Sequence, residues 1–253
     1  MTDLRQRAEQ ALAALDLTDL SDTCTDDDVI DLVARAKTPH GPVAAVCVWP
    51  RFVTTARRAI GKAPIKVATV VNFPSGMEPA SEVIAATEAA IADGADEIDV
   101  VVPWPALLEG HPENVPARVS RVKRASDGRP VKAIIESGML DKPELIRDAA
   151  MGAIDGGADF VKTSTGKVPV NATPEAARII LEAIRESGDD VGFKAAGGVK
   201  STEDAAVYLA LAEEIMGEGW ATPDRFRFGA SGVLGALLAT LEGRGSAAVS
   251  AGY

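Results

Sequence analysis

Three charged side chains stand inside short runs of Val, Ile and Phe that otherwise look like buried β-strands. They are Asp99, Lys162 and Lys194. Burying a charge costs several kcal/mol unless the charge is paired or lost by titration. A structural ion pair would explain Asp99 and one of the lysines, but it leaves the second lysine unexplained.

One carboxylate cannot neutralise two buried ammonium groups, so the second lysine favours loss of a proton from one of them at neutral pH. Desolvation and a nearby like charge both lower the pKa of a lysine, and a neutral amine is a nucleophile. Asp99, Lys162 and Lys194 therefore predict Schiff-base catalysis on a carbonyl compound, with the carboxylate moving protons.

Three loops of Gly, Ser and Lys follow predicted strands, at 163–167, 196–200 and 229–232. Glycines let backbone N–H groups approach a phosphate closely, and a helix N-terminus favours negative charge. If the loops meet at the carboxyl end of a barrel, they predict a phosphate site there.

The chain alternates strand-like and helix-like segments. Apolar β-branched runs predict seven strands, and a weaker candidate lies at 214–216; the runs are 43–48, 65–71, 97–102, 131–136, 159–163, 191–194 and 225–228. Capping signals and terminal glycines predict helices between the strands, at 79–92, 143–154, 176–187 and 201–211.

Eight such units favour an α/β fold, a single (β/α)₈ barrel domain over 1–253. Residues 2–15 and 26–37 are expected to add two extra N-terminal helices. The repeated Gly-Ala-Asp before 97 and before 160 aligns Asp99 with Lys162, which puts them on the third and fifth predicted strands. Lys132 and Glu136 should point inward on the fourth strand, as lumen filler or as partners of the site, and Glu97 is expected to be a partner of the site or a rim charge.

The composition of the chain argues against several classes of function. The 253 residues carry 26 Lys and Arg against 37 Asp and Glu, a net charge of −11 that repels nucleic acid and anionic membranes. No apolar run approaches the roughly 18 residues of a membrane helix. The start of the chain lacks a signal-peptide pattern, and Cys24 and Cys47 lack a metal-ligand spacing, so a cytoplasmic protein without a metal site is expected. The Gly/Ser/Ala-rich segment 243–253 is expected to be a flexible tail.

Several motifs together resemble the class I deoxyribose-phosphate aldolases along nearly the whole chain. The most specific is Lys-Thr-Ser-Thr-Gly-Lys at 162–167; the others are at 95–102, 170–175, 191–199 and 228–231, with further matches at 16–18, 44–51 and 71–76. The family pattern differs at Ala195, Lys200 and Gly232, where it often has Pro, Arg and Ser.

The resemblance implies roles residue by residue. Lys162 corresponds to the Schiff-base lysine, Asp99 to the proton-relaying acid and Lys194 to its neighbouring lysine. The positions implied to contact the substrate or its phosphate are Asp16, Thr18, Cys47, Thr165, Gly166, Lys167, Gly197, Gly198, Gly229, Ser231 and the terminal Tyr253. From the residues alone, Cys47 is most simply a small buried apolar side chain.

The implied activity is reversible cleavage of 2-deoxy-D-ribose 5-phosphate to D-glyceraldehyde 3-phosphate and acetaldehyde, without a metal or an organic cofactor. The expected partners are these small molecules and, in a homodimer, a second copy. Two alternatives are another Schiff-base lyase, transaldolase-like or acting on keto acids, and a sugar-phosphate-binding barrel without catalysis. The first would want a carboxylate-binding arginine or a lysine on another strand, and the second would predict replacement of Lys162 or Asp99.

Overall fold

The computed structural model describes residues 3–244, and a closed barrel of eight parallel strands forms its centre. Around the barrel the strand order is β1-β10-β9-β8-β7-β6-β5-β4. The barrel strands are β1 (Leu15–Asp19), β4 (Ala45–Val48), β5 (Lys66–Val71), β6 (Glu97–Val101), β7 (Val131–Ile134), β8 (Phe160–Lys162), β9 (Gly192–Ala196) and β10 (Phe226–Ala230). The predicted α/β barrel fold is confirmed.

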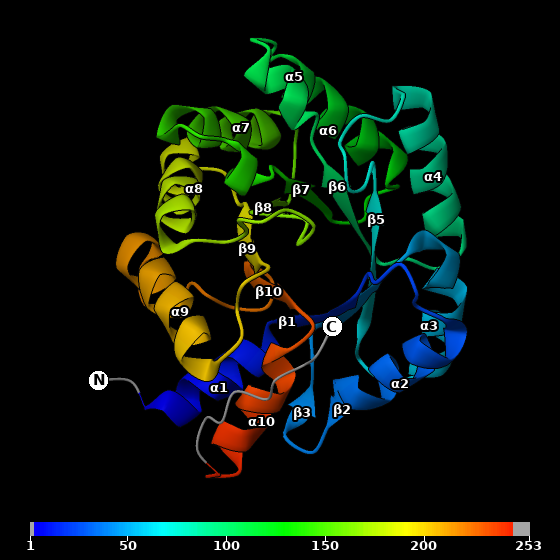
Figure 1. Ribbon diagram of the computed structural model, residues 1–253, viewed down its shortest axis with the longest axis vertical. Coiled ribbons are helices and arrows are strands. Elements are labelled where there is room, and N and C mark those ends of the chain that lie inside the picture. Colours follow the sequence, from blue (N-terminus) through cyan, green and yellow to red (C-terminus); the bar gives the residue numbers. More distant parts are fainter. Residues whose placement is uncertain (1–2, 245–253) are drawn as a thin grey trace.

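Helices surround the strands (Figure 1). They are α1 (Leu4–Ala13), α2 (Asp26–Ala36), α3 (Val53–Ile60), α4 (Ala80–Ala92), α5 (Trp104–Leu108), α6 (Asn114–Ala125), α7 (Pro143–Asp155), α8 (Pro174–Ser187), α9 (Thr202–Met216) and α10 (Val233–Leu241). Two 3₁₀ turns, Pro50–Phe52 and Ser137–Met139, and a small hairpin of β2 (Lys37–Thr38) and β3 (Gly41–Pro42) complete the described chain. None of the helices within residues 3–244 combines the length and apolarity needed to cross a membrane.

One predicted strand is wrong and one strand was missed. Glu214–Met216 is the last turn of α9 and not a strand, because the helix that begins at the Ser201 capping box continues to Gly217. The eighth strand is instead β1, at Leu15–Asp19. Asp99 and Lys162 consequently lie on the fourth and sixth barrel strands.

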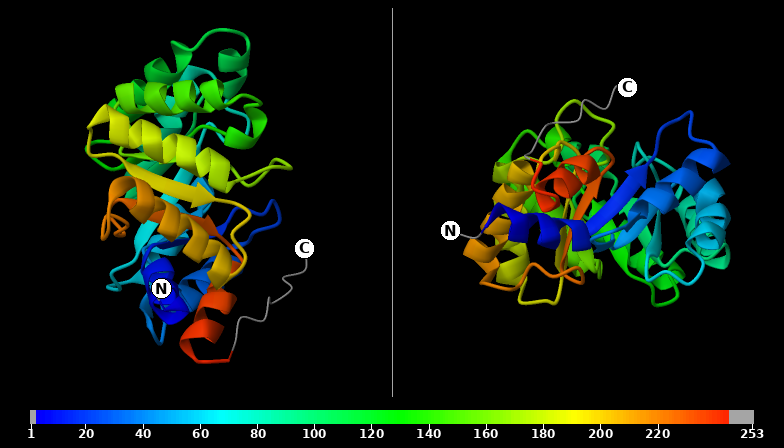
Figure 2. Two further views of the ribbon diagram at one scale, coloured as in Figure 1. Left: turned by 90° about the vertical axis from the view of Figure 1, so that its left-hand side faces the viewer. Right: turned by 90° about the horizontal axis from the view of Figure 1, so that it is seen from below.

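The two expected extra helices reduce to one. The helix α2 connects β1 with β4 and so belongs to the barrel repeat, while α1 alone precedes the first strand. Figure 2 shows α1 beside α9 and α10, and the Arg7 guanidinium joins it to Glu213 of α9 at 2.6 Å. This extra helix therefore packs on the outer layer of helices.

Side chains alternate strictly along the strands between an outer core and the barrel interior. Outward residues such as Val46, Ile98 and Phe193 belong to the large apolar core under the helices. A second, smaller apolar cluster lies among inward residues and includes Ala45 and Val70. Most of the charged strand residues also point inward, and these form the candidate site.

Candidate active site

Seven charged side chains from six strands meet inside the barrel, and we call this group the lumen network. All are at most 5% exposed; they are Asp16, Glu97, Asp99, Lys132, Lys162, Lys194 and Arg227. Each lies at an inward position of its strand, alternating with outward apolar neighbours. The two lysines of the predicted site are register partners on adjacent strands, Lys162 on β8 and Lys194 on β9.

Asp99 is the centre of the lumen network. Its Oδ2 accepts hydrogen bonds from Nζ of Lys162 at 2.8 Å and from Nζ of Lys194 at 2.8 Å. Its Oδ1 accepts a third bond from Nζ of Lys132 at 2.9 Å. The predicted meeting of Asp99, Lys162 and Lys194 is therefore present, with a third lysine on the same carboxylate.

Three of the four cations each contact two carboxylates at hydrogen-bond distance. Lys194 also donates to Asp16 at 2.5 Å, and Lys132 also donates to Glu97 at 2.6 Å. Arg227 bridges Asp16 at 2.7 Å and Glu97 at 2.9 Å. Lys162 differs, because within residues 3–244 its ion pairing is with Asp99 alone.

The count of charges in the lumen network corrects the premise of the sequence argument. Asp99 does not stand alone against two lysines; three carboxylates stand against four cations. With every group ionised, one positive charge is in excess, and release of one proton from a lysine removes it. That one lysine is neutral stays a prediction, which now rests on this larger set of charges.

Among the three lysines of the lumen network, Lys162 is the one whose pKa is lowered. Burial lowers the pKa of Lys162, and the Lys194 ammonium lowers it further, so that the attraction of Asp99 does not restore its ordinary value. Burial also opposes the charge on Lys194, yet Asp16 and Asp99 raise the pKa of Lys194 above its usual value. In the same way Asp99 and Glu97 outweigh burial and raise the pKa of Lys132.

The carboxylates of the lumen network stay ionised. Burial alone would favour the neutral acid, but Lys132, Lys162 and Lys194 hold the pKa of Asp99 well below its ordinary value. The site thus holds an amine of lowered pKa, that of Lys162, beside the Lys194 ammonium ion on one carboxylate. This combination can attack a carbonyl carbon and stabilise the resulting iminium cation.

The predicted phosphate loops follow β8, β9 and β10 and lie at one end of the barrel. Gly166 and Gly197 have positive φ, 86° and 77°, and Gly198 follows with φ of 85°. A Cβ on Gly197 would stand 2.7 Å from the Asn171 side chain, so this turn requires glycine. Gly229 and Ser231 lead into α10, which begins at Val233.

Lys167 is the basic side chain of the first loop, and Lys200 is that of the second. The Nζ of Lys167 lies 3.4 Å from Oδ1 of Asp22 and 5.9 Å from the centre of the Trp49 ring. The side chain is about one third exposed, so it is open to an anion at the end of the barrel. Its backbone N–H donates to Oγ1 of Thr165 at 3.0 Å.

Three further predicted substrate contacts, Asp16, Thr18 and Cys47, lie on the adjacent strands β1 and β4. Asp16 is fully buried and holds Lys194 and Arg227, while Oγ1 of Thr18 donates to the Asp16 carbonyl at 2.8 Å. Cys47 is fully buried on β4, and burial raises the pKa of its thiol. Tyr253 and the end of the predicted tail lie outside the described residues.

Sequence reasoning did not single out Arg227. It alternates with outward Phe226 and Phe228, so the signal that exposed Asp99, a charge at an inward position of an apolar run, was present there too. Glu97 proves to be a buried partner and not a rim charge, and Lys132 is also a partner of the site. Glu136 lies just beyond β7, where its carboxylate contacts Thr165.

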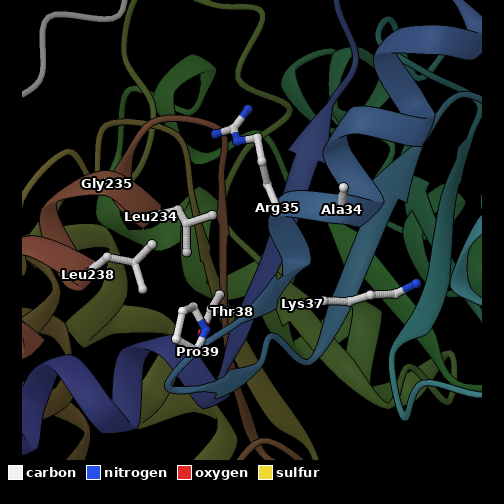
Figure 3. A pocket seen from close by; sticks show the side chains of 8 residues that line it. All are labelled: Ala34, Arg35, Lys37, Thr38, Pro39, Leu234, Gly235 and Leu238. Carbon is white, nitrogen blue, oxygen red and sulfur yellow. The ribbon is translucent and has the colours of Figure 1, made fainter.

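A separate hollow of about 310 Å³ lies on the outside of the barrel (Figure 3). Leu234 and Leu238 of α10 approach Thr38 and Pro39 there, and Lys37 points away. None of the predicted site residues lines this hollow.

Comparison with known proteins agrees with the geometry. The model of the DeoC/LacD family of aldolases matches residues 10–233. A curated deoxyribose-phosphate aldolase of Agrobacterium fabrum is 52% identical over 98% of this chain and 97% of its own.

Solved structures give the same result. A crystal structure from Toxoplasma gondii ME49, provisionally assigned as a deoxyribose-phosphate aldolase, is 28% identical with a TM-score of 0.85, over 93% of this chain and 94% of its own. The tetrameric deoxyribose phosphate aldolase of Aeropyrum pernix is 27% identical with a TM-score of 0.77, over 94% of this chain and 97% of its own.

Proposed function

The chain belongs to the DeoC/LacD family of aldolases, and from that premise we propose that it cleaves 2-deoxy-D-ribose 5-phosphate through a Schiff base on Lys162. The products are D-glyceraldehyde 3-phosphate and acetaldehyde, and the reaction is reversible. The observation that supports Lys162 as the nucleophile is its single ion pair in the lumen network, where the other cations each pair with two or three carboxylates.

In the first step the neutral amine of Lys162 attacks the C1 aldehyde of the open-chain sugar. The carbinolamine takes up a proton on its oxygen and loses water, which leaves a protonated Schiff base. The new iminium carries the charge that Lys162 lacked before the reaction, and it forms where the amine lies 2.8 Å from the Asp99 carboxylate. A fixed negative charge at this distance stabilises the cation as it develops.

In the second step the iminium accepts the electron pair of the breaking C2–C3 bond. The C3 hydroxyl releases its proton and becomes the aldehyde of the three-carbon product, and the two carbons left on the enzyme form an enamine. Protonation of the enamine at C2 and hydrolysis of the iminium release acetaldehyde and restore the amine of Lys162.

Asp99 and Lys194 handle the protons of both steps. Asp99 is held as a carboxylate, so it accepts protons or orients a water that does; Lys194 is held as an ammonium, so it donates. Lys162 and Lys194 both donate to the same oxygen of Asp99, Oδ2. A general acid and base at one atom can serve dehydration of the carbinolamine and protonation of the enamine.

The loops after β8, β9 and β10 hold the phosphate of the substrate. Gly166, Lys167, Gly197, Gly198, Gly229 and Ser231 are the proposed contacts, through backbone N–H groups, one hydroxyl and one ammonium. Thr18, Thr165 and Cys47 are proposed to line the path of the sugar, and Tyr253 to reach it from the end of the chain. Function in the cytoplasm and assembly as a homodimer stay predictions.

Borohydride reduction in the presence of acetaldehyde, followed by peptide mass mapping, tests the chemistry. Reduction of the Schiff base adds an ethyl group to one lysine, and we expect it on Lys162 alone. A label on Lys167 or Lys194 would reassign the nucleophile. If no lysine is labelled, the non-catalytic binding barrel becomes the better explanation.

A further inference from the structure

The turn after β7 contacts the neighbouring loop after β8 at three successive points. The backbone N–H of Ser137 donates to the Thr163 carbonyl at 2.8 Å, next to Lys162. Two residues further along the loop, Glu136 contacts Thr165. Near the loop's far end, Gly138 lies so close to Val170 that a Cβ on the glycine would fall 1.9 Å from the Val170 carbonyl oxygen.

Glu136 is the charged member of this contact, and its setting is unusual. Its side chain is buried, with the residue 1% exposed. Its backbone adopts the left-handed conformation, with φ of 52° and ψ of 54°. A side chain other than Gly, Asn or Asp rarely adopts this conformation without cost, and such residues concentrate at functional sites.

The Glu136 carboxylate accepts hydrogen bonds from Thr165 through both of its oxygens. Oε1 accepts the backbone N–H of Thr165 at 3.1 Å, and Oε2 accepts its hydroxyl at 2.5 Å. Since the hydroxyl donates to Glu136, its lone pairs are free to accept the backbone N–H of Lys167 at 3.0 Å. The carboxylate therefore fixes the direction of a relay that runs from Lys167 through Thr165 to Glu136.

The relay fixes the amides on both sides of Gly166, the turn residue of the proposed phosphate loop. It occupies the N–H groups of Thr165 and Lys167 and leaves the amide of Gly166 outside it. The same hydrogen bonds position the backbone of Lys167. The orientation of the phosphate loop thus depends on one buried acid in the turn after the neighbouring strand β7.

We propose that Glu136 is a positioning residue that shapes the Thr165–Lys167 loop for the substrate's phosphate and so sets the preference for phosphorylated over unphosphorylated aldehydes. The inference rests on the proposed function. Glu136 does not touch the reacting carbons in this account; it acts through Thr165. Burial raises the pKa of the Glu136 carboxyl, and the two bonds from Thr165 oppose that shift.

The test compares two substrates, 2-deoxy-D-ribose 5-phosphate and 2-deoxy-D-ribose, in the variants Glu136→Gln and Glu136→Ala. Loss of two bonds to a charged acceptor should lower kcat/KM for the phosphorylated sugar about 10- to 100-fold in Glu136→Ala, mainly through KM. The loss for the unphosphorylated sugar should be much smaller, so the ratio of the two kcat/KM values should fall. Glu136→Gln keeps the shape and should fall between wild type and Glu136→Ala.

Glu144→Gln is the matched control, because it removes an exposed acid in the first turn of α7, a short distance along the chain. It should leave the ratio unchanged. Equal losses on both sugars in Glu136→Ala, or an unchanged ratio in both Glu136 variants, would overturn the inference.

Borohydride trapping with acetaldehyde separates failure of this inference from failure of the proposed function. Acetaldehyde has no phosphate, so trapping on Lys162 should proceed in the Glu136 variants as in the wild type. If the wild type itself is not trapped, the proposed function fails; if trapping is slowed in Glu136→Gln as much as cleavage, Glu136 acts on Lys162 and the positioning account is wrong.

Discussion

The wall of the barrel interior formed by β4 and β5 differs in kind from the wall formed by β6 to β10 and β1. The first presents small apolar side chains, Ala45, Cys47, Ala68 and Val70. The second presents the seven charges of the lumen network. Both walls have the same alternation and the same parallel register.

This difference indicates that the barrel fold does not require the charges of the lumen network. Aliphatic residues fill one side of the same barrel, and well-packed apolar groups often replace a buried ion pair without loss of stability. An excess of one cation over the carboxylates is a costly feature for a core, and it favours loss of a proton from Lys162, whose pKa is lowered. We therefore interpret the charged wall as serving the chemistry and the apolar wall as serving packing.

The largest expected effect is that of Lys162→Leu. Loss of the nucleophile should lower kcat by about four orders of magnitude or more. The melting temperature should stay the same or rise, because the substitution replaces a buried polar amine with an apolar side chain of similar size. Lys66→Leu, an exposed lysine at the start of β5, is the control and should change neither property. A retained kcat in Lys162→Leu would contradict the comparison of the two walls.

In Lys162→Leu the free energy of unfolding should also depend less on pH at alkaline values, where Lys162 titrates. Burial and Lys194 lower the pKa of Lys162 in the folded protein, so the unfolded chain binds more protons between that pKa and about 10.4. The free energy of unfolding therefore rises with pH in this range, and Lys162→Leu should flatten the rise. Urea unfolding at several pH values measures the slope.

The second effect in size is that of Arg227→Met, measured as stability. The substitution leaves Asp16 and Glu97 short of a partner inside the barrel, and breaking a buried pair costs about 3–5 kcal/mol. Arg225→Met, an exposed arginine two residues earlier, should cost far less. Equal melting temperatures for the two variants would show that the charged wall is not a connected network.

The stability loss in Arg227→Met should depend on pH, because Arg227 pairs with the Asp16 carboxylate. Burial opposes its ionisation, but Lys194 and Arg227 hold the pKa of Asp16 below its ordinary value. Such a carboxylate stabilises the fold above about pH 4 and loses that contribution as the pH falls through the folded pKa. The gap in stability between Arg227→Met and the wild type should therefore be largest near neutral pH and shrink in acid.

The same comparison explains what the sequence could and could not predict. Seven strands were visible because Val, Ile or Phe mark their runs, and Asp99, Lys162 and Lys194 stood out within them. The strand Leu15–Asp19 was missed because its apolar residues are two leucines, which are good helix formers, and because the helix-like pattern of residues 2–15 runs directly into it. The charged Asp16 between the two leucines weakened the strand pattern further.

The ion pairs of the lumen network could not be predicted from the sequence either. Which carboxylate contacts which cation depends on register and on strands far apart in sequence, such as β1 and β10 around Asp16 and Arg227. Glu214–Met216 failed in the opposite way, because three residues with one β-branched side chain do not distinguish a strand from the last turn of a helix.

The third effect is on the pH profile of Lys194→Leu. Removing this ammonium takes away a charge that lowers the pKa of Lys162 and leaves three cations with three carboxylates. Lys162 should then be protonated at neutral pH, and the acid limb of the kcat/KM profile should move to higher pH by about one unit or more. Activity should recover in part in alkaline buffer. A variant equally slow at every pH would make Lys194 a direct donor or substrate ligand only.

The smallest effect is expected on the apolar wall, for Cys47→Ala. Cys47 lies in the barrel interior close enough for Asp99, Lys194 and Lys162 to influence it, yet burial raises the pKa of its thiol and keeps it neutral. Its removal therefore changes no charge, and a cavity the size of one atom should cost about 1 kcal/mol. The acid limb of the kcat/KM profile should stay where it is in the wild type. If Cys47→Ala moves that limb as Lys194→Leu does, the thiol takes part in setting the pKa of Lys162, and the division into a packing wall and a chemical wall does not hold.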